Sequence, residues 1–254
     1  MSLLEVRNVS FAYGEDPVLR NVSFDVDQNS MMSILGPNGV GKTTLLKCLC
    51  NLHRPDSGQI FLDGRDILEM SPKELARVVA YVPQKASVSK TTVFDSILIG
   101  RKPHMSLGMA DDDLEKTWRV IEDLELEDIY LKNVDEISGG QFQMVQIARA
   151  IVQEPKLLIL DEPSNNLDIS NQHITLRMIE KAVRGRGLCT IMTMHDINLA
   201  AYYSDRFLFV KQGRVHSYGG RETITPENIK SVYGIDVDVI EHKGLTTVIP
   251  LKDE

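Results

Sequence analysis

The feature that most constrains this chain is a glycine-rich loop at residues 36–44, between a short apolar run and a helix-forming segment. Glycines let backbone N–H groups approach phosphate oxygens closely, and a helix that starts there adds partial positive charge. The order strand, loop, helix is the one a phosphate-binding loop requires. The sequence therefore predicts a site for a nucleoside triphosphate, made of Gly36, Pro37, Asn38, Gly39, Val40, Gly41, Lys42, Thr43 and Thr44.

Two side chains of this loop have distinct predicted tasks. Lys42 would reach the β- and γ-phosphates, and the Thr43 hydroxyl would be a ligand of Mg²⁺. The alternative is a chance glycine turn, which the flanking strand and helix patterns disfavour. The loop alone leaves open what the energy of the nucleotide is used for.

Composition places the chain among ordinary globular proteins, since 43% of its 254 residues are hydrophobic and 25% are charged. A net charge of −8 without a basic tract argues against nucleic-acid binding. Three cysteines are too few for a disulfide framework, and we expect them to be packing residues in a reducing compartment. We recognise neither a signal peptide nor an apolar run of about 20 residues, so we expect a cytosolic chain.

Apolar periodicity predicts three kinds of segment. Residues 1–35 alternate as half-buried strands do, with Leu4, Val6, Val9, Val22, Phe24 and Val26 on the inner face. Residues 85–150 instead show helical spacing, at Leu114, Trp118, Ile121 and Leu124. Strand and helix patterns alternate again in residues 151–215, which indicates a parallel sheet covered by helices.

The predicted fold class is therefore α/β, in a single domain over residues 1–254. Residues 1–84 and 151–215 would form a core with a mainly parallel sheet and an N-terminal antiparallel β subdomain. Residues 85–150 would be an inserted α-helical subdomain, and residues 216–254 a C-terminal extension.

Two consecutive acidic residues, Asp161 and Glu162, follow the apolar run at residues 157–160 and form a second motif that we assign to the nucleotide site. A carboxylate at the carboxyl end of a parallel strand lies beside the phosphate loop, so we predict that Asp161 holds Mg²⁺ through water. Without the loop, two acids after a strand would indicate only a solvated turn.

A third motif shares the anion-binding feature of the glycine-rich loop, which is a set of glycine N–H groups at the start of a helix. Ser138, Gly139, Gly140 and Gln141 precede a helical pattern, so a hydroxyl and glycine N–H groups stand at a helix start, which suits an anion. A Gly-Gly turn that merely opens a helix is the alternative.

Taken in order, these motifs resemble the ATP-binding subunit of ATP-binding-cassette (ABC) transporters over almost the whole chain. The resemblance implies a P-loop NTPase (RecA-like) core that hydrolyses ATP with Mg²⁺, with Glu162 as the general base. Ser138–Gln141 resembles the LSGGQ motif, which in this family caps the γ-phosphate bound to the opposite subunit. The resemblance thus implies a head-to-tail homodimer with ATP at its interface.

Four further residues receive roles from the same resemblance. Gln84 would contact Mg²⁺ and the attacking water, and His195 would hydrogen-bond the γ-phosphate. Asp168, in the loop at residues 164–168, would sense the other subunit, and Tyr13 would stack on adenine. The structural alternatives are an exposed polar residue for Gln84, a strand-end histidine for His195, a helix cap for Asp168 and a buried strand-end tyrosine for Tyr13.

The resemblance also implies partners. The chain would act on integral-membrane permease subunits from the cytoplasmic face of the membrane, and indirectly on an extracytoplasmic substrate-binding protein. Part of the apolar set at Val88, Val93, Phe94, Ile97 and Leu98 would line a groove for a cytoplasmic helix of the permease, with Val93 and Phe94 as example positions, and part would be core.

The class of cargo is indicated only by sequence similarity, and no chemical property of these residues ties them to a ligand. The segment with Gly100-Arg101 and Pro103-His104 is similar to the ATPases of importers for iron–siderophore, haem and cobalamin. The alternatives are the ATPase of another ABC importer or exporter, or a soluble ABC ATPase in translation, repair or cluster assembly.

Overall fold

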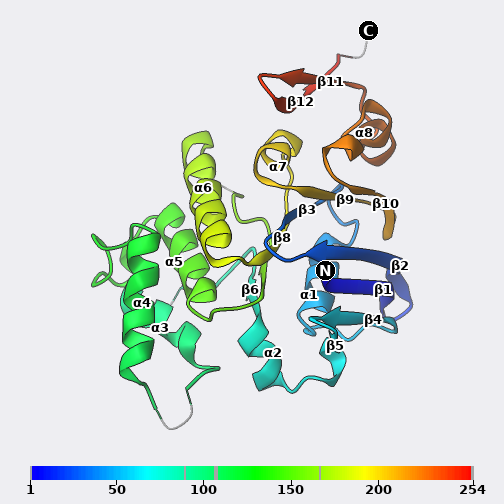
Figure 1. Cartoon of the computed structure of the whole chain (residues 1–254). Coiled ribbons are helices and arrows are strands. Elements are labelled where there is room, and N and C mark those ends of the chain that lie inside the picture. The colour runs from blue at the N-terminus through cyan, green and yellow to red at the C-terminus, as the bar shows by residue number, and fades with distance from the viewer. Residues whose placement is uncertain (1, 89, 106–107, 166, 253–254) are drawn as a thin grey trace. The chain divides into compact units, whose positions relative to one another are not determined.

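The computed structural model describes residues 2–88, 90–105, 108–165 and 167–252 (Figure 1). Of these, residues 2–70 and 189–252 form one compact unit, and those between 71 and 188 form a second. The finer division into core, helical subdomain and extension stays a prediction.

The first unit contains an antiparallel sheet with the strand order β2-β1-β4-β5. Its strands are β1 (Ser2–Tyr13), β2 (Asp16–Asp27), β4 (Ser57–Leu62) and β5 (Arg65–Asp66), followed by the short helix η1 (Ile67–Glu69). Leu4 lies opposite Val26 on one side and Leu62 on the other, and all three are buried. All six predicted inner residues of β1 and β2 are buried, so the predicted alternation is confirmed.

Parallel pairing organises the rest of this unit. Strand β3 (Met31–Leu35) pairs in parallel with β8 (Cys189–Thr193) on one side and β9 (Arg206–Lys211) on the other, and β10 (Arg214–Gly219) joins β9 antiparallel. All five residues of β3 are buried, as expected of a strand covered on both faces. Helix α1 (Lys42–Leu49) follows β3, and α7 (Ile197–Tyr203) follows β8.

The remaining elements of this unit are η4 (Arg221–Thr223), α8 (Pro226–Tyr233) and the hairpin of β11 (Val237–His242) and β12 (Leu245–Pro250). Thr225 caps α8, which ends at Gly234 with a φ of 78°. Both boundaries follow from the local sequence, because Thr-Pro starts a helix and glycine accepts the left-handed conformation that ends one.

The second unit contains a parallel strand pair, β6 (Val79–Val82) with β7 (Leu157–Leu160). Helix α2 (Pro72–Val78) leads into β6, and Ser71 and Glu74 form a capping box at its start, which a serine followed three residues later by a glutamate favours. Helix α6 (Ile169–Arg186) follows β7.

The helices of this unit are α3 (Val93–Leu98), η2 (Ile99–Arg101), α4 (Asp111–Asp123), η3 (Val134–Glu136) and α5 (Gly139–Ile151). Helix α3 packs on both α4 and α5, in the green part of Figure 1. Arg101 is 3% exposed, and its Nε donates to Asp113 Oδ1 at 2.9 Å. This hydrogen bond holds the pKa of the Asp113 carboxyl below its ordinary value, so the buried pair stays ionised.

The predicted helical pattern is confirmed by α4, but the buried face of this helix does not coincide with the apolar positions of the pattern. Ile121 is buried, but Trp118 is 37% exposed and its Nε1 donates to Glu122 Oε1 at 2.8 Å. The cause is the buried Arg101, which requires the Asp113 carboxylate to face inward. Thr117, one turn later, then lies on the buried stripe, where its hydroxyl donates to the Asp113 carbonyl at 2.7 Å.

The apolar set at the start of the helical segment is partly core, as predicted, but the choice of Val93 as a groove position is wrong. Val93 and Ile97 have no exposed surface, so they belong to the core between the helices and line no groove. Phe94 and Leu98 are half-buried, and Val88 is exposed. A six-residue helix has only one face to bury, and the sequence pattern does not show which side of it meets α4 and α5.

The three cysteines are free and buried, as predicted for packing residues. Burial raises the pKa of the Cys48 and Cys189 thiols to about 12, so neither forms a thiolate at neutral pH. None of the helices in the described part of the chain combines the length and the apolar character needed to cross a bilayer.

Candidate nucleotide-binding and hydrolysis site

The glycine-rich loop leaves the carboxyl end of β3 in a conformation that requires glycine. Gly36, Gly39 and Gly41 have φ values of 152°, 78° and 108°. A Cβ on Gly36 would lie 2.5 Å from the Val210 carbonyl oxygen, so no other residue fits there. Gly41 precedes α1 and has no side chain to cap it, so the first N–H groups of that helix stay suited to an external anion.

Lys42 is only 6% exposed, and its Nζ donates to the carbonyl oxygens of Gly36 and Pro37 at 2.7 and 3.2 Å. The ammonium group therefore spans the loop that precedes it. The positive charge of Lys42 therefore lies beside the loop residues that are predicted to surround the phosphate groups.

His195 stands at the same sheet edge as the loop. Thr193 of β8 pairs with Ile34 of β3, and the Met194 N–H donates to the Ile34 carbonyl at 3.2 Å. His195 follows directly and is exposed. The structure thus places the predicted histidine one strand away from the predicted phosphate loop.

Tyr13 ends β1 in the same unit, with 48% of its surface exposed. The buried strand-end tyrosine considered above is therefore excluded. Its hydroxyl oxygen lies 3.5 Å from Thr44 Oγ1, so the side chain reaches the end of the loop.

In the second unit, parallel pairing brings two predicted residues into contact although they are 78 positions apart. Val82 pairs with Leu160, and beyond these strand ends the Gln84 amide donates to Glu162 Oε2. Asn165 Nδ2 donates to the same oxygen at 2.6 Å. Glu162 itself has a φ of 52°, and these two amides fix its carboxylate.

Asp161 is 2% exposed at the end of β7. Its N–H donates to the Val82 carbonyl at 2.9 Å, and the Tyr81 hydroxyl donates to its Oδ2 at 3.4 Å. Sequence reasoning did not single out Tyr81 or Asn165 for these contacts. Asn165 lies within the predicted loop at residues 164–168, and that motif was its only sequence signal; Asn166 lies outside the described residues.

Ser138 and the residues after it start α5. The Gln141 N–H donates to Ser138 Oγ at 3.3 Å, and the Ser138 N–H donates to Gln141 Oε1 at 3.0 Å, which is a capping box. A Cβ on Gly139 would meet nothing within 4 Å, and one on Gly140 would make only an ordinary contact, 3.7 Å from Leu167 Cδ2. Neither glycine has a positive φ. Packing within this chain therefore does not explain the glycine pair.

Asp168 caps α6, since its Oδ1 accepts from the Asn171 N–H at 2.9 Å. Asp168 is thus a helix cap, which is the structural alternative given above, and a cap is compatible with a second role at an interface.

The donor chemistry of the predicted metal ligands fits Mg²⁺. A hydroxyl of Thr43, an amide oxygen of Gln84 and a carboxylate of Asp161 are all oxygen ligands. The described residues contain no cluster of three or more His, Cys, Asp or Glu side chains that could enclose a metal by itself. Mg²⁺ suits donors of this kind, because it usually binds one or two protein groups together with phosphate oxygens and water.

Comparisons with known proteins identify the family. The sequence profile described as ABC transporter matches residues 19–165. An uncharacterized ABC transporter ATP-binding protein of Methanocaldococcus jannaschii is 45% identical over 251 residues, which cover 99% of each chain. A Helicobacter pylori protein named a probable iron chelatin transport ATP-binding protein is 35% identical over 254 residues, covering 98% of this chain and 100% of the relative.

Among solved structures, a transporter assigned to the metal-chelate type of ABC transporters, in an inward-facing conformation, matches with a TM-score of 0.86 and 27% identity. The match covers 99% of this chain and 98% of that chain. These findings confirm the predicted α/β fold of a P-loop ATPase with an antiparallel N-terminal part. The chain therefore belongs to the ABC transporter family, as an ATP-binding and ATP-hydrolysing member.

Proposed function

We propose that the chain energises an importer of a metal chelate of the iron–siderophore, haem or cobalamin type, by hydrolysing ATP as a homodimer. The names of the similar iron chelatin protein and of the metal-chelate transporter support this cargo class. The ATPase of another ABC importer or exporter is the second candidate, and a soluble ABC ATPase the third. The cargo itself would be chosen by the permease and its extracytoplasmic substrate-binding protein.

In this proposal each residue has a role that its chemistry allows. The loop amides and Lys42 bind the phosphates, and Glu162 holds the attacking water and accepts its proton. Gln84 and Asn165 orient the Glu162 carboxylate through the hydrogen bonds described above. His195 donates to a γ-phosphate oxygen, and Tyr13 stacks on adenine. Mg²⁺, when bound through Thr43, Asp161 and Gln84, would neutralise charge on the transferred phosphoryl group.

One observation carries the dimeric part of the proposal. Two successive glycines open α5 where a Cβ would meet open space or ordinary contact and where φ is not positive. Glycine in a helix is up to about 1 kcal/mol less favourable than alanine, so a reason outside the fold is expected. Close approach of an external anion, the γ-phosphate of a nucleotide bound to a second copy, supplies that reason.

The first prediction separates stability from activity at these glycines. Gly139→Ala should leave the melting temperature unchanged or raise it, because the substitution adds helix propensity and meets no atom. Steady-state ATPase activity should nevertheless fall by at least about tenfold, since one lost γ-phosphate contact is worth about 1.4 kcal/mol or more. Calorimetry and a phosphate-release assay measure the two effects.

The matched control is Gly185→Ala, because Gly185 is also helical, exposed and free of nearby atoms, but lies near the end of α6. It should stabilise the chain without changing turnover. Full activity in Gly139→Ala would contradict the proposed role of the glycine pair.

The second prediction concerns the general base. Glu162→Gln keeps the shape and an oxygen that accepts from Gln84 and Asn165, but it removes the proton acceptor. We expect turnover to fall by about 100-fold or more while ATP binding persists, and the variant should accumulate as a dimer with ATP and Mg²⁺ on size-exclusion chromatography. Glu127→Gln, at an exposed turn, is the matched control and should behave as wild type. Turnover near the wild-type rate in Glu162→Gln would refute the assignment.

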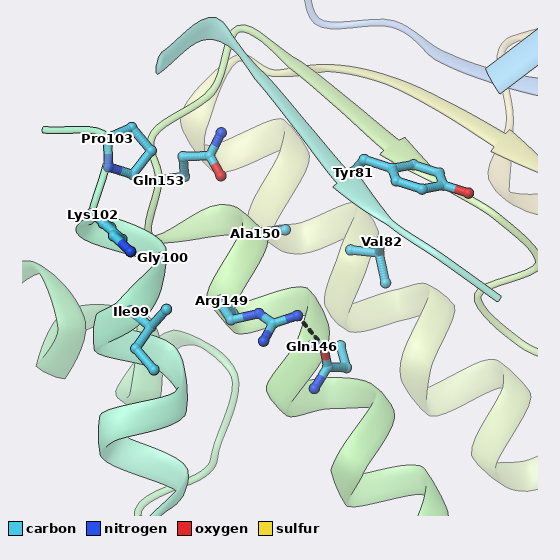
Figure 2. Close-up of a pocket in the computed structure, with 10 residues that line it drawn as sticks. All are labelled: Tyr81, Val82, Ile99, Gly100, Lys102, Pro103, Gln146, Arg149, Ala150 and Gln153. Carbon is cyan, nitrogen blue, oxygen red and sulfur yellow. Dashed lines mark hydrogen bonds between the residues drawn. The ribbon is translucent and has the colours of Figure 1, made fainter. Parts of the chain in front are cut away.

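We propose that the permease docks at a cavity of about 260 Å³ in the second unit (Figure 2), because Val93 is fully buried. Its walls come from the end of β6, from η2 with the two residues after it, and from α5. Ile99 is 53% exposed beside it, and a Cβ on Gly100 would lie 2.1 Å from the Arg149 carbonyl, so η2 is held tightly against α5.

Lys102 and Arg149 both line this cavity and give it positive charge, and Arg149 is the one that lies on α5. Its guanidinium donates to Gln146 Oε1 at 2.6 Å, as Figure 2 shows, and it forms no ion pair among the described residues. Burial lowers the pKa of Arg149, as expected of a partly desolvated cation. A cytoplasmic helix of the permease that places an apolar residue on Ile99 and an acidic residue near Arg149 would complement this cavity.

The third prediction tests this surface. Ile99→Asp should leave circular dichroism and ATP binding of the isolated chain unchanged, because the side chain is half exposed. The same variant should lose co-purification with its cognate permease and lose transport, since a carboxylate would be buried in the contact. Leu131→Asp, 69% exposed in the same unit and outside the cavity lining, is the control. A folded Ile99→Asp variant that co-purifies and transports normally would remove Ile99 from the docking surface. Val93→Asp, by contrast, should unfold the chain.

A further inference from the structure

We propose that His53 is a positioning residue of the nucleotide site, which with Phe11 holds the Tyr13 ring ready to stack on adenine. The inference deepens the proposed function and rests on it, because Tyr13 is there assigned to the base. His53 belongs to no motif of the sequence analysis. It follows α1 by a few residues, in the same compact unit as Tyr13 and the phosphate loop.

A hydrogen bond fixes the far end of the Tyr13 side chain. The Tyr13 hydroxyl oxygen and His53 Nε2 are 3.0 Å apart. Either tautomer of a neutral imidazole can share this bond, because a tyrosine hydroxyl both donates and accepts. The same hydroxyl lies 3.5 Å from Thr44 Oγ1, which ties the tyrosine to the start of α1.

Ring contacts fix the orientation of the Tyr13 ring. Phe11 and His53 stack with centroids 5.2 Å apart and an angle of 8° between their planes. Both stand perpendicular to Tyr13, at angles of 88° and 90° and centroid distances of 4.9 and 5.5 Å. Neither neighbour is stacked parallel on the tyrosine, and 48% of Tyr13 is exposed. The ring is therefore held in place while about half of the residue stays accessible to a ligand.

The backbone that carries His53 is itself anchored. The N–H groups of Leu52 and His53 both donate to the Lys47 carbonyl, at 2.9 and 3.2 Å. His53 is thus tied to the last turn of α1, the helix that the phosphate loop starts. If the Tyr13 ring that stacks on adenine is already fixed to the helix of the phosphate site, it loses less conformational entropy when the nucleotide binds.

The test compares a ligand that has a base with one that has none. Calorimetric titrations of the full chain with ATP and with inorganic tripolyphosphate, both with Mg²⁺, give dissociation constants for wild type, His53→Ala and His53→Gln. We expect His53→Ala to weaken ATP binding about three- to tenfold and to leave tripolyphosphate binding unchanged. The KM for ATP should rise in the same proportion, with kcat preserved.

Two further variants make the result specific. His53→Gln retains a group that can hydrogen-bond the Tyr13 hydroxyl, so its ATP affinity should return toward the wild-type value. In a Tyr13→Ala background, His53→Ala should have no additional effect on ATP binding, because the ring that it positions is gone. Leu52→Ala, at a neighbouring side chain that is 57% exposed, is the control and should bind both ligands normally.

Unchanged ATP affinity in His53→Ala, or an equal loss of affinity for ATP and tripolyphosphate, would overturn the proposal while leaving the ATPase assignment intact. A wild-type chain that binds neither ligand would overturn the proposed nucleotide site and this inference with it. Circular dichroism of each variant checks that the fold is retained.

Discussion

Parallel pairing between short buried strands is the interaction on which the rest of the structure depends. In one unit, β3 and β8 end side by side, so the phosphate loop and His195 leave the sheet at the same edge. In the other, β6 and β7 end side by side, and Gln84 contacts Glu162. Side chains far apart in the sequence meet because the carboxyl ends of parallel strands meet. The chemistry is therefore a consequence of the register of these two strand pairs.

The glycines of the two anion-binding motifs have different physical causes. At Gly36 the fold demands glycine, because φ is positive and the Val210 carbonyl lies where a Cβ would be. At Gly139 it does not, since the backbone is helical and the space is open. A residue that packing does not require, in a position where it weakens a helix, indicates a ligand that approaches from outside. Ser138 fits this interpretation, because its hydroxyl accepts from the Gln141 N–H at the start of α5 and the residue remains exposed to a ligand.

Local patterns were enough to predict much of the fold. A few neighbouring residues are enough to determine the capping box at Ser71, the end of α8 at Gly234 and the inner face of β1. Features that depend on distant partners were not predictable in this way. The face of α4 follows from the buried Arg101, Val93 is buried by helices later in the chain, and the contact of Tyr13 with His53 joins residues 40 positions apart. Among the site residues, the resemblance supplied Gln84 and His195, whose local sequence indicates no chemistry of its own.

The proposed homodimer depends on the start of α5 binding a nucleotide held by a second copy of the chain. Mixing Ser138→Arg chains with Lys42→Ala chains tests it directly, because each variant should be inactive alone for a different reason. A mixed dimer would place both defects in one site and leave the other intact, so partial recovery of ATPase activity is expected. Mixed dimers shown to form by tag-based capture, yet without any recovered hydrolysis, would contradict it.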